Sequence, residues 1–562
     1  MSENLKEKIS TFLASRGETF EGEFADDAPA LKKASRDASL FEVKPQLVVF
    51  PKNAADISRV VNFVRENKSA HDAGGSDTPL SITARSAGTC MSGGPLNESI
   101  ILDITKHIHG DTSIDAAGKT AVIQPGTFYR DFEPETLKNG LILPCYTASK
   151  NLCTLGGMVA NNSAGEKTLR YGKMENFVRE IKMVFVDGVE RVVKPLTRGE
   201  LEEKMAEDSF EAKIYRQIFE LIEKNHEKIV AAKPKVSKNS AGYYIWNVWD
   251  GETFDLTKLI VGSQGTLGIV TEATLKLVPV KPVSKLFVIF MPNISRLGEL
   301  VKAILPFKPE SLESYDDSTM KLAVKFLPSM LKSMKTAGFL KLIFSFLPEA
   351  WMLLTGGFPK LILLVEFSGD SEAEINKKMA ELENGVKNFG FKMRATSSPS
   401  EAEKYWTIRR ESFNLLRQHV KGRRTAPFVD DVVVAPEHLP EFLPKMRAIL
   451  DEYKLLYTIA GHAGNGNFHI IPLMDMKDGR NRRIIREVSD KIYDLVAEYH
   501  GSITGEHNDG IIRTPYLQKM YGAEICEIFA QIKHIFDPQN IFNPGKKVGG
   551  TLEYLDEHLV RS

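Results

Sequence analysis

This sequence of 562 residues has little cysteine, no long apolar run and no excess of charge of either sign. Its four cysteines include no CxxC pair, which excludes a disulfide framework and an internal iron–sulfur cluster. No stretch reaches the ~18 uninterrupted apolar residues of a membrane-spanning helix. Lys+Arg and Asp+Glu each total 73, so no global charge favours nucleic acid as a partner. Because the N-terminus MSENLKEKIS also lacks the apolar core of a secretory signal, we expect a cytoplasmic protein.

The order of helical and strand-like patterns predicts an α+β fold. At ~150 residues per domain, the length predicts three or four units. Residues 1–40 indicate a helical lead-in and an acidic loop, and an α/β pattern begins at LVVFPKNAADISRVV. Prolines at 279, 282 and 292 mark a boundary near 280–285, after which strands and helices mix without an internal repeat.

A local basic and apolar segment interrupts the second part. Within residues 318–358, Lys321, Lys325, Lys332 and Lys335 fall on one arc of a helical wheel, opposite apolar side chains. That pattern is typical of a helix lying in the plane of a membrane surface. A helical hairpin whose lysines face solvent explains it equally well, and both interpretations stay open.

Three glycine clusters stand out in the first part, at residues 85–94, 154–165 and 262–268. Glycines beside small hydroxyl residues let backbone N–H groups converge on an anion such as a pyrophosphate. No cluster matches GxxxxGK[ST] or a clear GxGxxG, so P-loop and Rossmann sites are disfavoured. The three loops together predict a nucleotide cofactor of another class.

The sequences of these loops resemble the flavin-binding loops of the vanillyl-alcohol oxidase superfamily. They read RSAGTCMSGG, CTLGGMVANNSAG and VGSQGTLGIVTE. The resemblance is strongest to its FAD-linked D-2-hydroxyacid dehydrogenases, such as D-lactate dehydrogenases and glycolate oxidase subunits. It implies a PCMH-type FAD-binding domain with two α/β subdomains, an α+β cap with an antiparallel sheet, and a C-terminal helical return to the cofactor. The residues it implies for FAD are Arg85, Ser86, Ala87, Gly88, Thr89, Met91, Ser92, Pro144, Ser149, Thr154, Gly156, Gly157, Asn161, Ser163, Gly165, Tyr171, Gly172, Gly265, Ile269 and Asn543.

The sequence departs from the family pattern at three places around the flavin. Gln264 stands where glutamate is usual, Cys145 and Tyr146 replace a proline-aspartate, and no histidine occupies the tethering position of the first loop. We therefore expect non-covalent FAD. Cys90 and Cys153 flank flavin loops, so a thioether link stays open as the alternative, beside the interpretation of both as inert cysteines.

A histidine hairpin carries the second set of chemical groups. Asn465-Gly466 is a strong two-residue turn signal. With that turn, His462 and His469 pair directly on one face, about 4.5–5.5 Å apart at Cβ. Glu506 lies in a glycine-rich loop, and two histidines with one carboxylate form a metal site that has open positions.

In the family, GHAGDGNLH and GEHGxG supply this same set. The resemblance therefore implies that His462, His469 and Glu506 bind a divalent metal (Zn, Mn or Fe) and that His507 lies beside the substrate hydroxyl. Arg409 matches the arginine that pairs with the substrate carboxylate. The lysine that clamps a second carboxylate in 2-hydroxyglutarate enzymes would fall near Val429 and is missing. Asn508-Asp509 replaces a glycine pair, which we expect to add a carboxylate near the site.

The predicted function is FAD-dependent oxidation of a D-2-hydroxy acid, D-lactate favoured, with His507 and Arg409 as catalytic residues. Alternatives are a glycolate or D-2-hydroxyglutarate dehydrogenase, an FAD oxidase or a transferase of the same superfamily, and a non-catalytic flavoprotein subunit. Quinone or a separate electron-transfer protein would take the electrons, with peripheral membrane contact through residues 318–358. The predicted divisions are 1–40 (lead-in), 41–282 (FAD-binding), 283–510 (substrate/cap) and 511–562 (C-terminal return).

Overall fold

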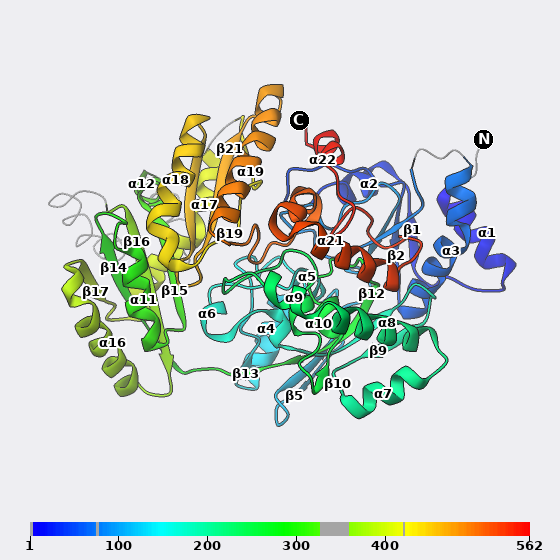
Figure 1. Cartoon of the computed structure of the whole chain (residues 1–562), viewed down its shortest axis with the longest axis horizontal. Helices are drawn as coiled ribbons and strands as arrows, with labels where there is room; N and C mark the ends of the chain where they lie inside the picture. Colours follow the sequence, from blue (N-terminus) through cyan, green and yellow to red (C-terminus); the bar gives the residue numbers. More distant parts are fainter. Residues whose placement is uncertain (1–3, 75–77, 326–358, 420–421, 562) are drawn as a thin grey trace.

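The computed structural model of this protein describes residues 4–74, 78–325, 359–419 and 422–561. Its elements form two halves that lie side by side (Figure 1). The N-terminal elements and the helices near the C-terminus build one half, and the chain between strand β14 and helix α19 builds the other. Among these described residues, we find no helix that combines the length and the apolar character needed to span a membrane.

A four-stranded sheet begins the first half, with the order β1-β2-β4-β3. Its strands are β1 (Glu23–Ala25), β2 (Leu47–Phe50), β4 (Ile100–Asp103) and β3 (Ile82–Arg85). Strands β2, β4 and β3 are parallel, and β1 is antiparallel to β2. Helices α1 (Leu5–Ser15) and α3 (Ala54–Ala73) pack on one face of this sheet, and α2 (Ala28–Ala34) on the other. Leu5, Ile9 and Leu13 recur every four residues along the buried side of α1, which lies within the predicted lead-in of residues 1–40.

An antiparallel five-stranded sheet completes the first half. Its order is β5 (Thr112–Asp115), β6 (Thr120–Ile123), β12 (Ile269–Lys276), β8 (Val178–Val184) and β9 (Glu190–Val193). Helices α4 (Tyr129–Lys138), α5 (Leu155–Asn161), α7 (Arg198–Ala206), α8 (Phe210–Lys224) and α9 (His226–Ala232) surround it. The second glycine cluster runs into and through α5, and the third leads directly into β12.

An eight-stranded antiparallel sheet forms the second half. Its order is β17 (Lys392–Ala395), β14 (Val283–Met291), β16 (Leu361–Gly369), β15 (Ser311–Asp316), β20 (Leu456–His462), β21 (Asn467–Met474) and β18 (Arg424–Thr425), with β19 (Val432–Val433) also on β21. Alternate side chains of β14 and β16 face opposite sides of the sheet. Helices α11 (Leu297–Ile304), α16 (Glu372–Val386) and α18 (Leu439–Glu452) pack in the core of one side, and α17 (Pro399–His419) covers the other.

Most of the predicted membrane-associating insertion, residues 326–358, lies outside the described residues. The first residues of the insertion, 318–325, belong to helix α12 (Asp317–Lys325). At the base of the insertion, Asp317 pairs with Lys321 at 2.9 Å and with Lys360 at 3.2 Å. The choice between a membrane-surface helix and an internal hairpin therefore stays a prediction.

The C-terminal segment returns to the first half of the molecule. After α19 (Gly479–Glu498), helices α21 (Leu517–Phe536) and α22 (Leu552–His558) lie over the N-terminal elements, red beside blue in Figure 1. The segment also extends the four-stranded sheet, because Ile82 N donates to Ile541 O and Asn543 N donates to Ile82 O, both at 2.8 Å.

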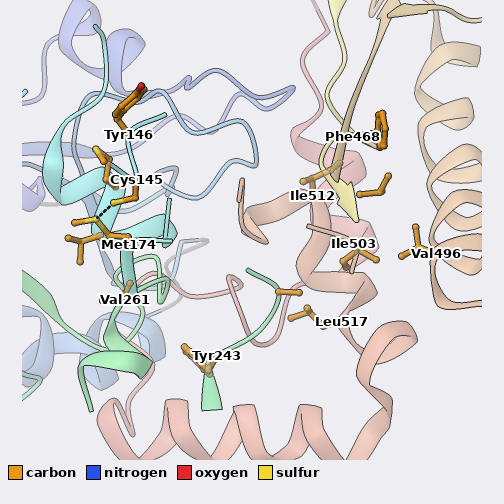
Figure 2. Close-up of a cluster of buried hydrophobic side chains, with 14 of the residues drawn as sticks. Cys145, Tyr146, Met174, Tyr243, Val261, Phe468, Val496, Ile503, Ile512 and Leu517 are labelled. Carbon is orange, nitrogen blue, oxygen red and sulfur yellow. Dashed lines mark hydrogen bonds between the residues drawn. The ribbon is translucent and has the colours of Figure 1, made fainter. Parts of the chain in front are cut away.

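One large buried cluster of apolar side chains joins the two halves. Figure 2 shows part of it: Cys145 and Met174 come from the first half, and Phe468 and Val496 come from the second. Cys145 Sγ lies 3.5 Å from Met174 Sδ, the dashed contact in the figure. Because the two halves share this core, their positions relative to each other are fixed.

Candidate active site

A cavity of about 700 Å³ lies where the glycine-rich loops of the first half face the eight-stranded sheet of the second. Thirteen of the residues predicted to bind FAD line it. They are Ser86, Ala87, Gly88, Thr89, Met91, Ser149, Thr154, Gly156, Gly157, Asn161, Ser163, Gly165 and Gly265. All three glycine clusters therefore contribute to one wall, although up to about 180 positions separate them in the sequence.

Two glycines of the second cluster are required by close approach of backbone. A Cβ on Gly165 would stand 1.9 Å from the carbonyl oxygen of Tyr146, and one on Gly156 would stand 2.5 Å from Pro125 Cβ. Thr154 begins helix α5 by accepting a hydrogen bond from Gly157 N at 3.3 Å. These contacts bring the loop against its neighbours and leave its backbone facing the cavity.

Seven predicted FAD residues lie outside the cavity wall: Arg85, Ser92, Pro144, Tyr171, Gly172, Ile269 and Asn543. Arg85 points away from the cavity and donates to the carbonyl of Ala34 at 3.3 Å. Ile269 is buried in the core of the first half. Arg85 and Ile269 therefore do not face the cavity.

Asn543 connects the first and third glycine loops by hydrogen bonds. Its side-chain Oδ1 accepts from Thr83 Oγ1 at 2.9 Å, and its Nδ2 donates to the carbonyls of Gly94 at 2.9 Å and Gln264 at 2.7 Å. The side chain is fully buried, so the amide connects the C-terminal segment to two glycine loops at once.

Replacing Asn543 by alanine should weaken both the fold and the retention of flavin. The variant leaves two buried carbonyls and a hydroxyl without their partner, at a cost of about 1–3 kcal/mol for each unsatisfied group. We expect a lower Tm and a lower flavin-to-protein ratio on purification. The exposed Gln531→Ala variant on α21 is the control and should change stability by less than about 0.5 kcal/mol; an unchanged Tm and flavin ratio for Asn543→Ala would contradict this assignment.

Gln264, the unusual residue of the third loop, uses both ends of its amide. Its Nε2 donates to Asn161 Oδ1 at 3.1 Å, and its Oε1 accepts from Gly510 N at 2.8 Å. A carboxylate at this position could accept from Gly510 but could not donate to Asn161. The glutamine therefore joins two cavity loops and the loop that carries Glu506.

The histidine hairpin forms, with a different register from the predicted one. His462 pairs with Asn467, and His469 pairs with Ala460, because the turn is a 3-10 segment (Ala463–Asn465) followed by Gly466 at φ +66°. The direct pairing that we predicted is wrong. The observed register differs from the predicted one by an even number of residues, so both histidines still face the same side of the ribbon. Their ring centroids lie 5.2 Å apart.

Glu506 lies between the imidazoles. Its Oε1 is 3.3 Å from His462 Nε2, 3.1 Å from His469 Nε2 and 3.9 Å from His507 Nε2. The donor atoms of His462, His469 and Glu506 lie within 4.8 Å of one another. The second oxygen of Glu506 accepts from the buried ammonium of Lys238 at 3.1 Å.

Two further carboxylates orient the rings through the opposite nitrogens. Glu313 Oε1 lies 2.6 Å from His462 Nδ1. Asp430 Oδ1 lies 3.1 Å from His469 Nδ1, and its Oδ2 lies 2.7 Å from His507 Nδ1. Each Nδ1 therefore faces a carboxylate, and each Nε2 is left facing Glu506 and the cavity.

The charges of this cluster depend strongly on each other. Burial alone lowers the pKa of His469, but Asp430 and Glu506 on either side of the ring raise it to about 10. Burial opposes the charged form of His507 as well, yet its pKa is raised because Asp430 faces it. Burial would raise the pKa of Glu506, but Lys238 and the neighbouring imidazoles hold it well below its usual range. The carboxylates are thus ionised at neutral pH and keep the rings in place.

Two adjacent arginines of α17 reach the cavity from the sheet side. Arg409 Nη2 lies 3.1 Å from Glu313 Oε2, and its buried Nε has no partner among the described residues. Arg410 donates to Glu166 Oε1 at 2.7 Å. Val429 is fully buried and outside the cavity wall, so the position of the missing lysine is filled by core.

Asp509 does not add a carboxylate to the cavity, contrary to our expectation. Its side chain is fully buried on the far side of the loop, where it lies 2.9 Å from Lys547 Nζ and accepts from Gly242 N at 2.8 Å. Asn508 turns the loop at φ +67° and donates to Gly262 O at 2.9 Å. Both replacements of the glycine pair therefore stabilise the loop.

Comparison with known proteins matches two family models to this chain. Residues 45–193 match the FAD binding domain, and residues 281–547 match the C-terminal domain of FAD linked oxidases. A D-2-hydroxyglutarate dehydrogenase from Pseudomonas putida is 28% identical over 95% of this chain and 51% of its own length. A D-lactate dehydrogenase from Archaeoglobus fulgidus is 26% identical over 93% of this chain and 94% of its own length.

The fold is also that of proteins whose structures have been solved. The structure of p-cresol methylhydroxylase with substrate bound matches with a TM-score of 0.68 at 15% identity, over 98% of both chains. The predicted α+β class with a PCMH-type FAD-binding fold is therefore confirmed. This chain spans about half the length of the D-2-hydroxyglutarate dehydrogenases that it matches. The two family models together cover most of the chain, so this protein combines an FAD binding domain with a C-terminal domain of the FAD linked oxidase type.

Proposed function

We propose that this protein oxidises a D-2-hydroxy acid, D-lactate favoured, to the corresponding 2-oxo acid. The observation that carries the proposal is the cluster of three histidines and Glu506, with Arg409 nearby, in the cavity that the flavin loops line. Relatives named D-lactate dehydrogenase and D-2-hydroxyglutarate dehydrogenase support the reaction class. Glycolate and D-2-hydroxyglutarate remain the alternative substrates.

The cavity suits FAD in volume and in lining. About 700 Å³ lies within the range of roughly 300–1,000 Å³ typical of cofactor and ligand sites. Gly156 and Gly165 line this cavity without a side chain, which suits the close approach of a phosphate chain. FAD, when bound, supplies the acceptor for a hydride from the substrate carbon. Burial raises the pKa of the Cys90 and Cys153 thiols, which supports non-covalent binding because neither is a reactive thiolate.

His462, His469 and Glu506 have the donor chemistry of a divalent metal site. Two imidazole nitrogens and one carboxylate oxygen suit Zn, Mn or Fe and leave positions open for a substrate. Carboxylates behind the ligating rings, here Glu313 and Asp430, are the usual companions of such sites. A metal in this site supplies Lewis acidity toward the substrate hydroxyl.

Arg409 binds the substrate carboxylate in this proposal. Within the part of the chain that the structure describes, its Nε has no partner, so the guanidinium retains a donor for an incoming anion. Glu313 holds the other side of the group at 3.1 Å and fixes its plane. The arginine thereby orients the hydroxy carbon, and a misplacement of 1 Å costs on the order of 10²-fold in rate.

His507 removes the hydroxyl proton. Its Nε2 faces the cavity, while its Nδ1 is held 2.7 Å from Asp430 Oδ2. The ring stacks on His469 with centroids 5.0 Å apart, which limits its rotation. Asp430 stabilises the imidazolium that forms when the proton arrives.

The electrons then leave to a partner outside the chain, for which we propose quinone or a separate electron-transfer protein. The four cysteines lie at positions 90, 145, 153 and 526 and form no cluster motif in the sequence. The divisions 1–40, 41–282, 283–510 and 511–562 and the peripheral membrane contact through 318–358 likewise stay proposals.

Removal of metal tests the metal-assisted part of this function. Dialysis against a chelator should abolish turnover with D-lactate while the flavin absorbance stays, because the ligands lie apart from the glycine loops. Adding back Zn²⁺, Mn²⁺ or Fe²⁺ one at a time should restore activity with one of them. Full turnover by a preparation shown to be metal-free would remove the metal from the chemistry.

A further inference from the structure

The pairing of strands β20 and β21 identifies the residues that line the cavity next to the histidines. On the hairpin, His469 lies opposite Ala460, and the next pair on the same face is Thr458 opposite Ile471. Two residues along a strand correspond to roughly 7 Å. Ala460, Thr458 and Ile471 all line the cavity, so the floor next to the metal-binding side chains is neutral.

The neighbouring strand extends this floor with a second threonine. Thr425 of β18 pairs with Leu473 of β21, two residues beyond Ile471 and on the same face. Thr425 also lines the cavity. The three side chains together, Thr425, Thr458 and Ile471, offer two hydroxyls and one branched apolar group, and we call them the neutral floor.

The arginines that line the cavity are already paired. Arg409 lies 3.1 Å from Glu313, and Arg410 lies 2.7 Å from Glu166. Arg36 also lines the cavity, and it pairs with Glu42. No lysine is among the described residues of the wall. A second carboxylate on the substrate would therefore have to displace a protein carboxylate or be buried without a counter-charge.

We infer that the neutral floor receives the substrate's side chain and selects 2-hydroxy monocarboxylates with a short uncharged side chain over dicarboxylates. This inference rests on the proposed function. The Thr458–Ile471 rung lies roughly 7 Å along the hairpin from the His469 rung, so a side chain that extends from the hydroxy carbon in this direction points toward Thr458 and Ile471. Ile471 packs against its methylenes, and neither threonine compensates a negative charge. Thr458 and Ile471 are thus specificity-determining residues.

A matched pair of substrates tests the inference by separating charge from length. D-2-hydroxyglutarate and D-2-hydroxypentanoate have the same number of carbons, and only the first carries a distal carboxylate. In anaerobic flavin reduction, the wild-type protein should prefer D-2-hydroxypentanoate by about 10²-fold or more in rate at low substrate. Equal rates, or a preference for D-2-hydroxyglutarate, would overturn the inference. Failure of both of these and of D-lactate to reduce the flavin would instead refute the proposed function.

A designed change of specificity gives the second test. Thr458→Lys places an ammonium on the neutral floor and should reverse the preference, so that D-2-hydroxyglutarate becomes the better substrate. Thr458→Ser keeps the neutral hydroxyl and should retain the wild-type preference. A folded, flavin-containing Thr458→Lys protein with the wild-type preference would count against the inference.

A binding measurement on the wild-type protein covers the case in which Thr458→Lys does not fold. Titration with 2-oxopentanoate should perturb the flavin absorbance at concentrations about 10²-fold lower than titration with 2-oxoglutarate, because only the latter has a distal carboxylate. Tighter binding of 2-oxoglutarate would contradict the neutral floor.

Discussion

Replacing His507 by asparagine should lower kcat by about 10²–10⁴-fold, the range expected when a general base is removed. The ring lies in the cavity wall with its Nδ1 held by Asp430, so Nε2 is the nitrogen available to take the hydroxyl proton. Flavin content should stay near that of the wild type, because Asn508 and Gly510, and not the His507 side chain, connect this loop to the glycine clusters. The measurement is single-turnover flavin reduction by D-lactate at saturating substrate.

His500→Asn is the matched control for this variant. His500 is exposed, carries the same change of side chain and has a positive φ that asparagine tolerates. Its kcat should equal that of the wild type. If His507→Asn retained a rate within a few-fold of the control, proton removal would belong to another group.

Replacing Asp430 by asparagine should lower kcat by about 10²–10⁴-fold through two rings at once. One oxygen of Asp430 faces His469 Nδ1 and the other faces His507 Nδ1. The neutral amide cannot stabilise an imidazolium and leaves the tautomer of both rings unspecified. Loss of a carboxylate behind a ligating histidine also weakens metal affinity by about 10–100-fold.

Two readouts separate these effects in Asp430→Asn. Metal titration followed by protein-bound metal analysis reports His469, and single-turnover reduction at saturating metal reports His507. Asp490→Asn, an exposed carboxylate that pairs with Lys519, is the control and should change neither. Wild-type metal affinity together with wild-type reduction rate in Asp430→Asn would show that Asp430 positions neither ring.

The sequence was sufficient for the parts of the site that are local in the chain. Glycines beside small hydroxyl residues act through their own backbone, so the loops around Gly88, Gly157 and Gly265 were identified from their composition. The hairpin pattern placed His462 and His469 on one face. The predicted register of the hairpin was wrong because Asn-Gly occurs both in a tight two-residue turn and at the end of a 3-10 turn. The 3-10 turn shifts the pairing of the two strands by two residues.

The supporting groups could not be predicted because distant elements supply them. Glu313 reaches His462 because β15 happens to pair with β20, and Lys238 reaches Glu506 from a loop 268 positions earlier. Asp430 follows no motif, and only the fold brings it between two histidines. For Asp509 the prediction was wrong: its proximity to Glu506 in the sequence indicated a carboxylate at the site, but the side chain is buried against Lys547.

Anaerobic reduction of the bound flavin by a panel of 2-hydroxy acids tests the central claim most directly. The purified, metal-loaded protein would be mixed with D-lactate, L-lactate, glycolate or D-2-hydroxyglutarate, and the flavin absorbance would be followed. We predict rapid bleaching by D-lactate, slow bleaching by glycolate and D-2-hydroxyglutarate, and none by L-lactate. A fully flavinated protein whose absorbance no member of the panel changes would contradict the assignment as a D-2-hydroxyacid dehydrogenase.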